Sequence, residues 1–213
     1  MNRAELAELA QAVSERCQGR RLRLLVCCGT PCVAAGAEQV AERLRERIVA
    51  MGEPGCELEM VRTGCLGPCS RGPLLTIQSQ GQPDAIYERV TPDQADRLLA
   101  CCLEGQRPVE GLLQDDFPFF SQQKRLVLEN SGRIDPEDIE QYIGAGGYEG
   151  LAQALHEMTP DQVCEEIVAS GLRGRGGGGY STGLKWQLVL KSDGARKFVV
   201  ANGDEGDPGA YMD

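Results

Sequence analysis

Histidine is nearly absent from this chain of 213 residues, which has only His156. A metal site built from several histidines is therefore excluded. Basic residues are also in the minority, with 22 Lys and Arg against 32 Asp and Glu and a net charge of −10. Such a chain lacks the positive surface that binds a phosphate backbone, so nucleic acid is not expected as a partner.

Long apolar runs are missing as well. No stretch approaches the roughly 18 apolar residues that span a bilayer, so direct membrane insertion is not expected. Residues 1–13 alternate apolar and charged residues at helical spacing, which predicts a folded helix rather than a signal peptide. These patterns predict a cytoplasmic protein. Apolar residues amount to 41% of the chain, enough for one or two compact domains.

Cysteine, in contrast, is abundant, with ten residues. Thiols stay reduced in the cytoplasm, so this number indicates metal, cluster or redox use rather than a disulfide framework. Four of them form two close pairs, Cys27-x4-Cys32 and Cys65-x3-Cys69, each directly after a predicted strand. Two thiolate pairs on neighbouring Gly/Pro loops can form a tetrathiolate site.

The spacing of these cysteines separates the candidate sites. Zinc ribbons and thioredoxin-type redox pairs use C-x2-C, which this chain lacks. The two unequal loops therefore favour a [2Fe–2S] cluster, with zinc or unconnected core thiols as the alternatives. Cys28 adjoins Cys27 and could in principle replace it. The remaining cysteines are interpreted as packed or exposed thiols: Cys17, Cys56, Cys101, Cys102 and Cys164.

The hydrophobic pattern predicts an α/β first unit. We expect, in order, a helix at residues 1–13, a strand at 22–26, a helix at 36–51, strands at 58–62, 74–78 and 85–90, and a helix at 91–102. A Gln-Gly-Gln-Pro turn predicts that the last two strands form a hairpin. Thr91, followed by Pro92 and Asp93, has the composition of a helix N-cap.

Residues 105–123 have the composition of a linker, and their three phenylalanines are interpreted as an anchor for docking. Cap-like sequences at Asp135 and Thr159 predict two or three short helices within residues 135–170. The pattern ends with a glycine-rich loop at residues 171–179, a helix from about Thr182 and a strand at residues 197–201.

The glycine-rich loop contains Gly174-Arg175-Gly176-Gly177-Gly178-Gly179. Although this run satisfies G-x-G-x-x-G, the residues before it have helical spacing, so it is not a Rossmann fingerprint. Successive glycines can turn backbone N–H groups inward as an anion nest, and Arg175, Lys185 and a helix start suit a phosphate. A flexible linker is the alternative.

An acidic turn follows the last predicted strand: Asn202-Gly203-Asp204-Glu205-Gly206-Asp207-Pro208-Gly209. Its carboxylates repel phosphate but accept hydrogen bonds from ribose or ribityl hydroxyls and from ring N–H groups, while Asn202 both donates and accepts. A calcium loop would require a different spacing of the acids. A solvated acidic turn is the remaining alternative.

The order of elements and cysteines over residues 2–103 resembles the thioredoxin-like [2Fe–2S] ferredoxin family, which includes the small iron–sulfur subunit of respiratory complex I. The resemblance implies that Cys27, Cys32, Cys65 and Cys69 bind the cluster. It places Cys28 at a position that is not usually a ligand.

The glycine-rich loop and the acidic turn together resemble the FMN and NADH site of the complex I flavoprotein subunit. Because they follow a ferredoxin-like unit, the whole chain resembles the flavin-bearing beta subunit of NAD(P)-linked multimeric hydrogenases and formate dehydrogenases. Five positions depart from the usual family residues, which are Ala, Phe, Pro, Ala and Glu: Gly178, Tyr180, Ser181, Gly203 and Asp207.

The resemblance also implies roles for individual residues. The loop, Lys185 and the acidic turn hold FMN, and Tyr180 stacks on the nicotinamide nucleotide. Glu205 and Asp207 are the catalytic candidates. The implied cofactor-binding residues are Gly174, Arg175, Gly176, Gly177, Gly178, Gly179, Tyr180, Lys185, Asn202, Asp204 and Glu205.

The domain organisation implied by the resemblance is a ferredoxin domain at residues 1–104, a linker at 105–134 and the truncated start of an α/β FMN/NADH-binding domain at 135–213. A complete chain would exchange hydride between NAD(P)H and FMN and pass single electrons through iron–sulfur clusters, with [4Fe–4S] cysteines only in a missing C-terminal part. The expected partners are other subunits of a hydrogenase, formate dehydrogenase or complex I-like assembly.

Residues 1–213 alone are expected to hold the [2Fe–2S] cluster but neither to bind FMN tightly nor to turn over NADH. The alternative function is a stand-alone [2Fe–2S] electron carrier or docking protein.

Overall fold

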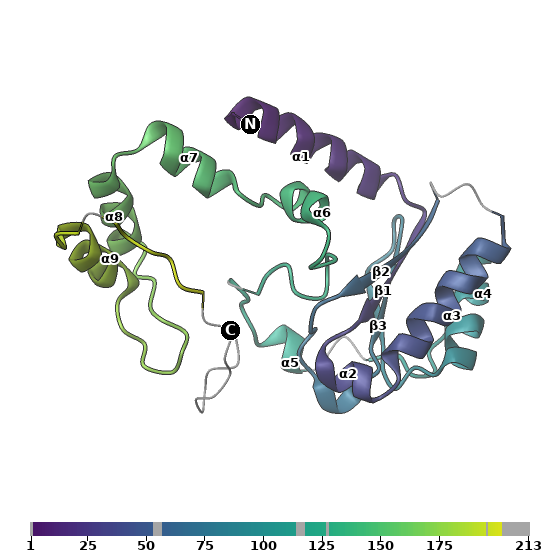
Figure 1. Ribbon diagram of the computed structural model, residues 1–213. Coiled ribbons are helices and arrows are strands. Elements are labelled where there is room, and N and C mark those ends of the chain that lie inside the picture. The colour runs from purple at the N-terminus through teal and green to yellow at the C-terminus, as the bar shows by residue number, and fades with distance from the viewer. Residues whose placement is uncertain (1, 53–56, 114–117, 127, 195, 202–213) are drawn as a thin grey trace. The chain divides into compact units, whose positions relative to one another are not determined.

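The computed structural model describes residues 2–52, 57–113, 118–126, 128–194 and 196–201. Clustering of contacts divides the chain into two compact units, one made by residues 4–147 and the other by the remaining described residues. Figure 1 shows the elements of both units. Among the helices of the described ranges, none combines the length and the apolar character needed to span a bilayer.

A four-stranded sheet forms the centre of the first unit, with the strand order β2-β1-β3-β4. Its strands are β1 (Leu22–Cys27), β2 (Leu58–Thr63), β3 (Leu75–Ser79) and β4 (Ala85–Tyr87). Strand β1 runs parallel to β2 and antiparallel to β3, and β3 and β4 form the predicted antiparallel hairpin. Because β1 and β2 are parallel, Cys27 and Thr63 end at the same edge of the sheet.

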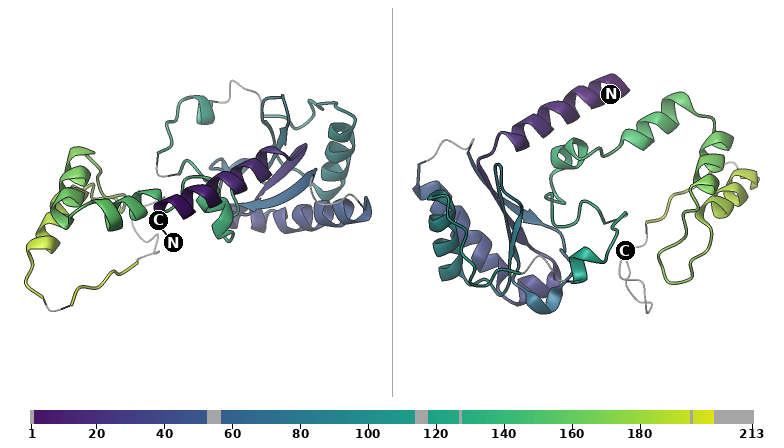
Figure 2. Two further views of the ribbon diagram at one scale, coloured as in Figure 1. Left: turned by 90° about the horizontal axis from the view of Figure 1, so that it is seen from above. Right: turned by 180° about the vertical axis from the view of Figure 1, so that it is seen from behind.

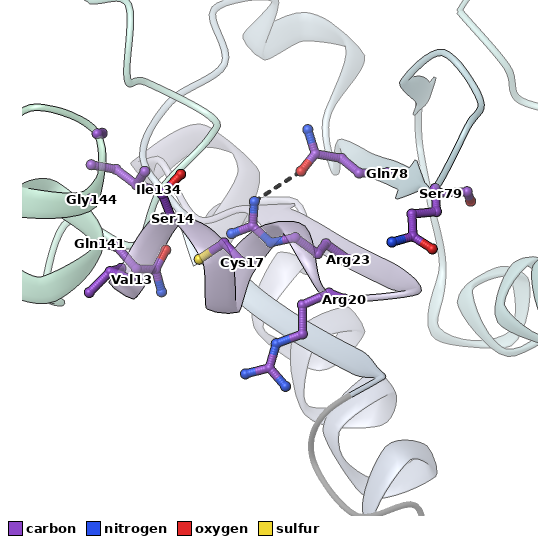
Figure 3. Close-up of a pocket in the computed structure, with 12 residues that line it drawn as sticks. Val13, Ser14, Cys17, Arg20, Arg23, Gln78, Ser79, Ile134, Gln141 and Gly144 are labelled. Atoms are coloured by element: carbon purple, nitrogen blue, oxygen red, sulfur yellow. Dashed lines mark hydrogen bonds between the residues drawn. The ribbon is translucent and has the colours of Figure 1, made fainter. Parts of the chain in front are cut away.

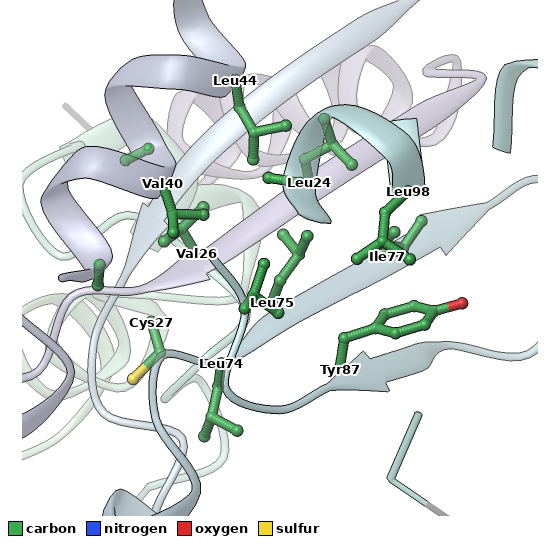
Figure 4. Packing of buried hydrophobic residues seen from close by; sticks show 14 of the residues in the cluster. Leu24, Val26, Cys27, Val40, Leu44, Leu74, Leu75, Ile77, Tyr87 and Leu98 are labelled. Atoms are coloured by element: carbon green, nitrogen blue, oxygen red, sulfur yellow. The ribbon is translucent and has the colours of Figure 1, made fainter. Parts of the chain in front are cut away.

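Helices α3 (Ala37–Ala50) and α4 (Pro92–Leu103) pack side by side on one face of this sheet (Figures 1 and 2). Alternate residues of β1 point toward them, and Leu24 and Val26 are fully buried. They pack with Val40 and Leu44 of α3 and with Leu98 of α4 (Figure 4). Burying each of these side chains contributes about 1.5–3 kcal/mol, so this layer fixes the sheet edge that carries the cysteines.

Two helix boundaries follow directly from their caps. Thr91 caps α4 as predicted, and its hydroxyl and the side chain of Gln94 form a capping box. The first helix, α1, extends over Arg3–Gln18 and is longer than the predicted residues 1–13. A short helix that the sequence pattern missed, α2 (Thr30–Ala34), contains Cys32, the second cysteine of the first pair. Pro31 at its start fits a first helical turn.

The residues after α4 also pack on the first unit. The N–H of Glu88 donates to the carbonyl of Gly111 at 2.8 Å, and the N–H of Leu113 donates to the carbonyl of Ile86 at 2.8 Å. Helix α5 (Pro118–Ser121) and helix α6 (Ile139–Gly144) follow. Residues 105–113 therefore run along the edge strand β4.

Helix α6 corrects the predicted cap at Asp135. The cap is Asp138, whose side chain accepts from the N–H groups of Glu140 and Gln141. Asp135 instead accepts from the N–H of Glu137 at 2.9 Å, which makes a local turn. Asp135 and Asp138 are both residue types that can cap a helix, but only Asp138 directly precedes the first residue of α6, Ile139.

The second unit contains helices α7 (Glu149–Glu157), α8 (Pro160–Ala169) and α9 (Thr182–Lys191). Helices α6, α7 and α8 confirm the predicted series of short helices within residues 135–170, and α9 confirms the helix predicted from about Thr182. Thr159 caps α8 through a capping box. Helices α8 and α9 pack against each other. Gly183 makes this approach possible, because a Cβ there would lie 2.6 Å from the backbone nitrogen of Val168.

The predicted strand at residues 197–201 is wrong. These residues are extended but pair with no strand among the described residues. Phe198, Val199 and Val200 are almost fully exposed, at 81%, 101% and 85%. The apolar, β-branched pattern matched a buried strand, but a strand also requires a partner for its backbone hydrogen bonds.

Candidate functional site

The four paired cysteines come from two loops at one edge of the sheet. Cys27 is the last residue of β1, and Cys32 lies in α2. Cys65 follows β2, and Cys69 begins the 3₁₀ helix η1 (Cys69–Arg71). The parallel pairing of β1 and β2 therefore brings the two sequence motifs together. Cys27 and Cys32 are buried, Cys69 is half-buried and Cys65 is exposed.

The four thiols form a connected chain of contacts. The Sγ atoms of Cys65 and Cys69 are 3.6 Å apart. The thiol of Cys27 is hydrogen-bonded to those of Cys32 and Cys65. Two ligands of one tetrahedral metal with metal–sulfur bonds of about 2.3 Å lie about 3.8 Å apart. The separation of Cys65 and Cys69 therefore suits a pair of thiolates on one metal.

The contacts among the four thiols shift their pKa values in different directions. The hydrogen bond to Cys27 raises the pKa of Cys65, and the hydrogen bond to Cys32 raises the pKa of Cys27. Burial, followed by the hydrogen bond to Cys65, raises the pKa of Cys69. The hydrogen bond from Cys27 lowers the pKa of Cys32. Cys32 is therefore the one thiol of these four whose pKa lies below the usual range of a cysteine.

Backbone N–H groups also point at the sulfur atoms. Those of Leu66 and Gly29 act on Cys27, that of Leu74 acts on Cys32 and that of Gly67 acts on Cys65, and each favours the thiolate. Backbone donors of this kind stabilise the negative charge of sulfur ligands and tune iron–sulfur centres.

Two glycines leave room for the sulfurs. A Cβ at Gly72 would lie 2.7 Å from Sγ of Cys32, and a Cβ at Gly29 would lie 3.0 Å from Cβ of Cys65. A residue with a side chain at either place would push a cysteine away. The glycine positions beside the cysteine pairs are thus part of the site.

The four thiols supply two pairs of sulfur donors. No group of three or more His, Cys, Asp or Glu side chains in the described ranges is arranged to hold one metal ion. A [2Fe–2S] cluster is bound by four cysteine thiolates, two on each iron. The pairs Cys27/Cys32 and Cys65/Cys69 match that requirement.

The other described cysteines lie apart from this chain of thiols. Cys28 has its pKa raised by burial, and the charges that act on it include Arg62 and Glu38. Cys101 and Cys102 are half-buried in α4, and Cys164 is buried in α8. Their separate locations agree with the interpretation as packing residues. Cys56 lies outside the described residues.

A cavity of about 310 Å³ lies elsewhere in the first unit, between α1, β3 and α6 (Figure 3). Cys17 and Arg20 line it beside Arg23. Arg23 is already engaged, since it donates to Glu59 at 2.7 Å and to Gln78 at 3.0 Å. None of the predicted site residues lines this cavity.

The glycine-rich loop connects α8 to α9, and two backbone hydrogen bonds join the two ends of the loop, called its base below. The N–H of Gly174 donates to the carbonyl of Tyr180 at 2.8 Å, and the N–H of Thr182 donates to the carbonyl of Leu172 at 3.0 Å. Ser181 caps α9. The base therefore holds the glycines next to the N-terminus of a ten-residue helix, where N–H groups and the helix dipole favour an anion.

Arg173 shapes this loop, although it was not among the predicted cofactor-binding residues. Its Nε donates to the carbonyl of Gly179 at 2.6 Å, so it braces the loop from within. Gly177 and Gly179 have positive φ values of 91° and 60°, which favour glycine. Tyr180 is 57% exposed, so its ring is accessible for stacking.

The structure brings together only part of the predicted flavin site. The glycines, Arg175 and Tyr180 lie in the loop, and Lys185 lies in the first turns of α9. The acidic turn lies outside the described residues, so the placement of its predicted site residues stays a prediction: Asn202, Asp204, Glu205 and Asp207.

Comparison with known families adds to this geometry. Residues 6–103 match the family described as thioredoxin-like [2Fe-2S] ferredoxin. Residues 167–213 match the Nuo51 FMN-binding domain. The first match contains all four paired cysteines, and the second contains the glycine-rich loop and the acidic turn.

Curated relatives match the chain over parts of their own length. The NADP-reducing hydrogenase subunit HndC of Solidesulfovibrio fructosivorans is 50% identical over 43% of this chain and 18% of that protein. The NAD-reducing hydrogenase HoxS subunit alpha of Cupriavidus necator is 29% identical over 91% of this chain and 32% of that protein. A subunit of the NADH-quinone oxidoreductase of Escherichia coli is 40% identical over 37% of this chain and 18% of that protein. The chain thus spans about a third or less of these relatives.

Among solved structures, the thioredoxin-like [2Fe-2S] ferredoxin from Aquifex aeolicus is similar over 45% of this chain and 99% of that chain, with 22% identity and a TM-score of 0.39.

Proposed function

This chain joins a thioredoxin-like [2Fe–2S] ferredoxin domain to residues of a Nuo51 FMN-binding domain, and from that pairing we propose that it is an electron-transfer subunit of an NAD(P)H oxidoreductase. The observation that carries the proposal is the convergence of the four thiols of Cys27, Cys32, Cys65 and Cys69. The bound groups would supply hydride exchange between NAD(P)H and FMN and single-electron transfer through iron–sulfur centres.

The cysteine site has the asymmetry expected of an electron carrier. Cys27 and Cys32 hold the inner side, where both are buried, and Cys65 and Cys69 hold the side toward solvent. The backbone N–H groups of Gly29, Leu66, Leu74 and Gly67 stabilise the thiolates. The outer pair gives electrons a short path to a partner, while the inner pair anchors the cluster in the core.

The loop between α8 and α9 is proposed to bind the phosphate end of FMN. Arg175, Lys185 and the N-terminus of α9 supply positive charge, and glycine residues allow the backbone to approach an anion. Tyr180 is proposed to stack on the nicotinamide nucleotide. Asn202, Asp204 and Glu205 are proposed to contact the flavin, with Glu205 and Asp207 at the hydride-transfer site.

The same proposal includes partners and location. Relatives are named as subunits of NAD(P)-reducing hydrogenases and of NADH-quinone oxidoreductase, which supports assembly with other subunits of a hydrogenase, formate dehydrogenase or complex I-like complex. A cytoplasmic location is proposed because the described cysteines are free thiols, as expected in a reducing compartment.

A redox titration of the anaerobically reconstituted full chain tests the electron-transfer proposal. The visible absorption is expected to bleach and recover reversibly as one electron enters and leaves each protein molecule. A structural zinc site has no redox chemistry of its own. A chain that binds zinc and shows no reversible bleaching would contradict the proposal.

The flavin part requires a separate test. Weak binding of FMN to residues 1–213 is expected to quench its fluorescence at high protein concentration, and Lys185→Ala is expected to weaken this binding about tenfold further, as for the loss of one charge-assisted hydrogen bond. Lys191→Ala, at the other end of α9, is the matched control and should leave the affinity unchanged. Equal affinities of the two variants would remove Lys185 from the flavin site.

A further inference from the structure

The described residues of the segment 118–133, called the strap below, pack on the loop that carries Cys65 and Cys69. A Cβ at Gly67, between these two cysteines, would lie 2.4 Å from Cζ of Phe119. A Cβ at Gly132 would lie 2.4 Å from Cδ1 of Leu66. Both ends of the strap therefore contact the outer cysteine loop through positions that only glycine fits.

The middle of the strap carries a cation, Arg125. Its guanidinium lies 5.4 Å from the centre of the Phe120 ring, and Phe120 makes an edge-to-face contact with Phe119 at 5.3 Å between ring centres. Nη1 of Arg125 donates to the carbonyl of Ser131 at 3.3 Å. Arg125 is thus tied to both ends of the strap, next to the residues that touch the cysteine loop.

Arg125 and Cys65 lie close enough to influence each other electrostatically. Burial and the nearby Arg133 lower the pKa of Arg125, while Cys65 raises it. An arginine stays charged despite such a shift. Across the described ranges, no ion pair includes Arg125. Arg71 ends the 3₁₀ helix that begins at Cys69. In contrast to Arg125, it forms an ion pair with Glu88 at 2.9 Å.

We propose that Arg125 sets the reduction potential of the [2Fe–2S] cluster, shifting it toward more positive values. This inference rests on the proposed function, since it requires a cluster at the four cysteines. Reduction adds one negative charge to the cluster, and a nearby positive charge stabilises that state. A half-buried cation supplies that stabilisation and is screened less by salt than an exposed one. Arg125 would act on the cluster through its charge and not as a cluster ligand, so it is a positioning residue and not a catalytic one.

Arg125→Gln in the full, reconstituted chain tests the proposal by a redox titration followed by absorption and electron paramagnetic resonance. At the potential where the wild type is half reduced, the ratio of reduced to oxidised cluster is expected to fall about fivefold, as for removal of one partly screened charge. Arg125→Lys keeps the charge and should restore the ratio. Arg45→Gln removes an equal charge from the exposed face of α3 and should change the ratio less than twofold.

Iron and sulfide contents separate the possible failures. A wild type without a cluster would contradict the proposed function. A wild type and an Arg125→Gln variant with equal cluster contents and equal potentials would overturn the inference alone, as would equal shifts in Arg125→Gln and Arg45→Gln. Should Arg125→Gln not fold, Arg125→His serves instead. Its potential should fall relative to the wild type between about pH 5.5 and pH 8, because the imidazole loses its charge there, and an unchanged difference would overturn the inference.

Discussion

Replacing Gly72 with alanine is expected to impair cluster binding without a strained backbone. Gly72 has φ −65° and ψ 160°, which alanine adopts freely. The new Cβ, however, would lie 2.7 Å from Sγ of Cys32 and 3.4 Å from the carbonyl oxygen of Cys69. The substitution therefore acts on a proposed ligand atom and not on the local chain conformation.

The size of the effect follows from these distances. Non-bonded heavy atoms in contact lie about 3.5–4.0 Å apart, so Sγ of Cys32 must move by about 1 Å. Overpacking of this kind costs about 1–3 kcal/mol of folding free energy. Metal–ligand distances tolerate deviations of about 0.2 Å, so the cluster is more sensitive than the fold.

The assay is the iron and acid-labile sulfide content of anaerobically reconstituted Gly72→Ala, together with its visible absorption. Gly64→Ala is the matched control, because Gly64 precedes Cys65 directly but a Cβ there meets nothing within 4 Å. We expect Gly72→Ala to lose most of its cluster and Gly64→Ala to keep it. Equal contents in the two variants would refute the steric reasoning.

Four further predictions concern the thiols and the core. Cys65→Ser should abolish the visible absorption of the cluster and Cys101→Ser should not, and equal losses in spectra of the two variants would show that the ligands are wrongly chosen. Because the pKa values of Cys27 and Cys65 are raised, iron uptake by the metal-free protein should increase with pH. The free energy of unfolding of that form should decrease above about pH 8.5, where unfolded thiols ionise first; chemical denaturation across this range checks the sign. Leu44→Ala should lower the free energy of unfolding by about 2–5 kcal/mol, because Leu44 is fully buried.

The sheet unit was largely predictable because its signals are local. Strand β1 is an apolar run in which every residue except Arg23 is buried, and the Gly/Pro loops after the strands carry the cysteine pairs. Thr91 was recognised as a cap from three consecutive residues. The parallel pairing of β1 and β2 brings the two cysteine pairs together. No single sequence motif predicts this pairing, because it depends on the arrangement of the whole sheet.

The strap and its contacts were less predictable. Phe119 was interpreted as part of an anchor, which its contact with Gly67 supports, but its target lies about 50 positions away in the sequence. Nothing local in the sequence indicates that Arg125 and Cys65 influence each other electrostatically. The strand expected at residues 197–201 failed for the related reason that pairing depends on a distant partner.

The most direct test of the account is the iron, acid-labile sulfide and zinc content of the full chain purified without oxygen. Convergence of Cys27, Cys32, Cys65 and Cys69 predicts iron and sulfide in equal amounts, with the visible absorption of a [2Fe–2S] cluster. Stoichiometric zinc with neither iron nor sulfide would contradict the central claim that these thiolates hold an iron–sulfur cluster.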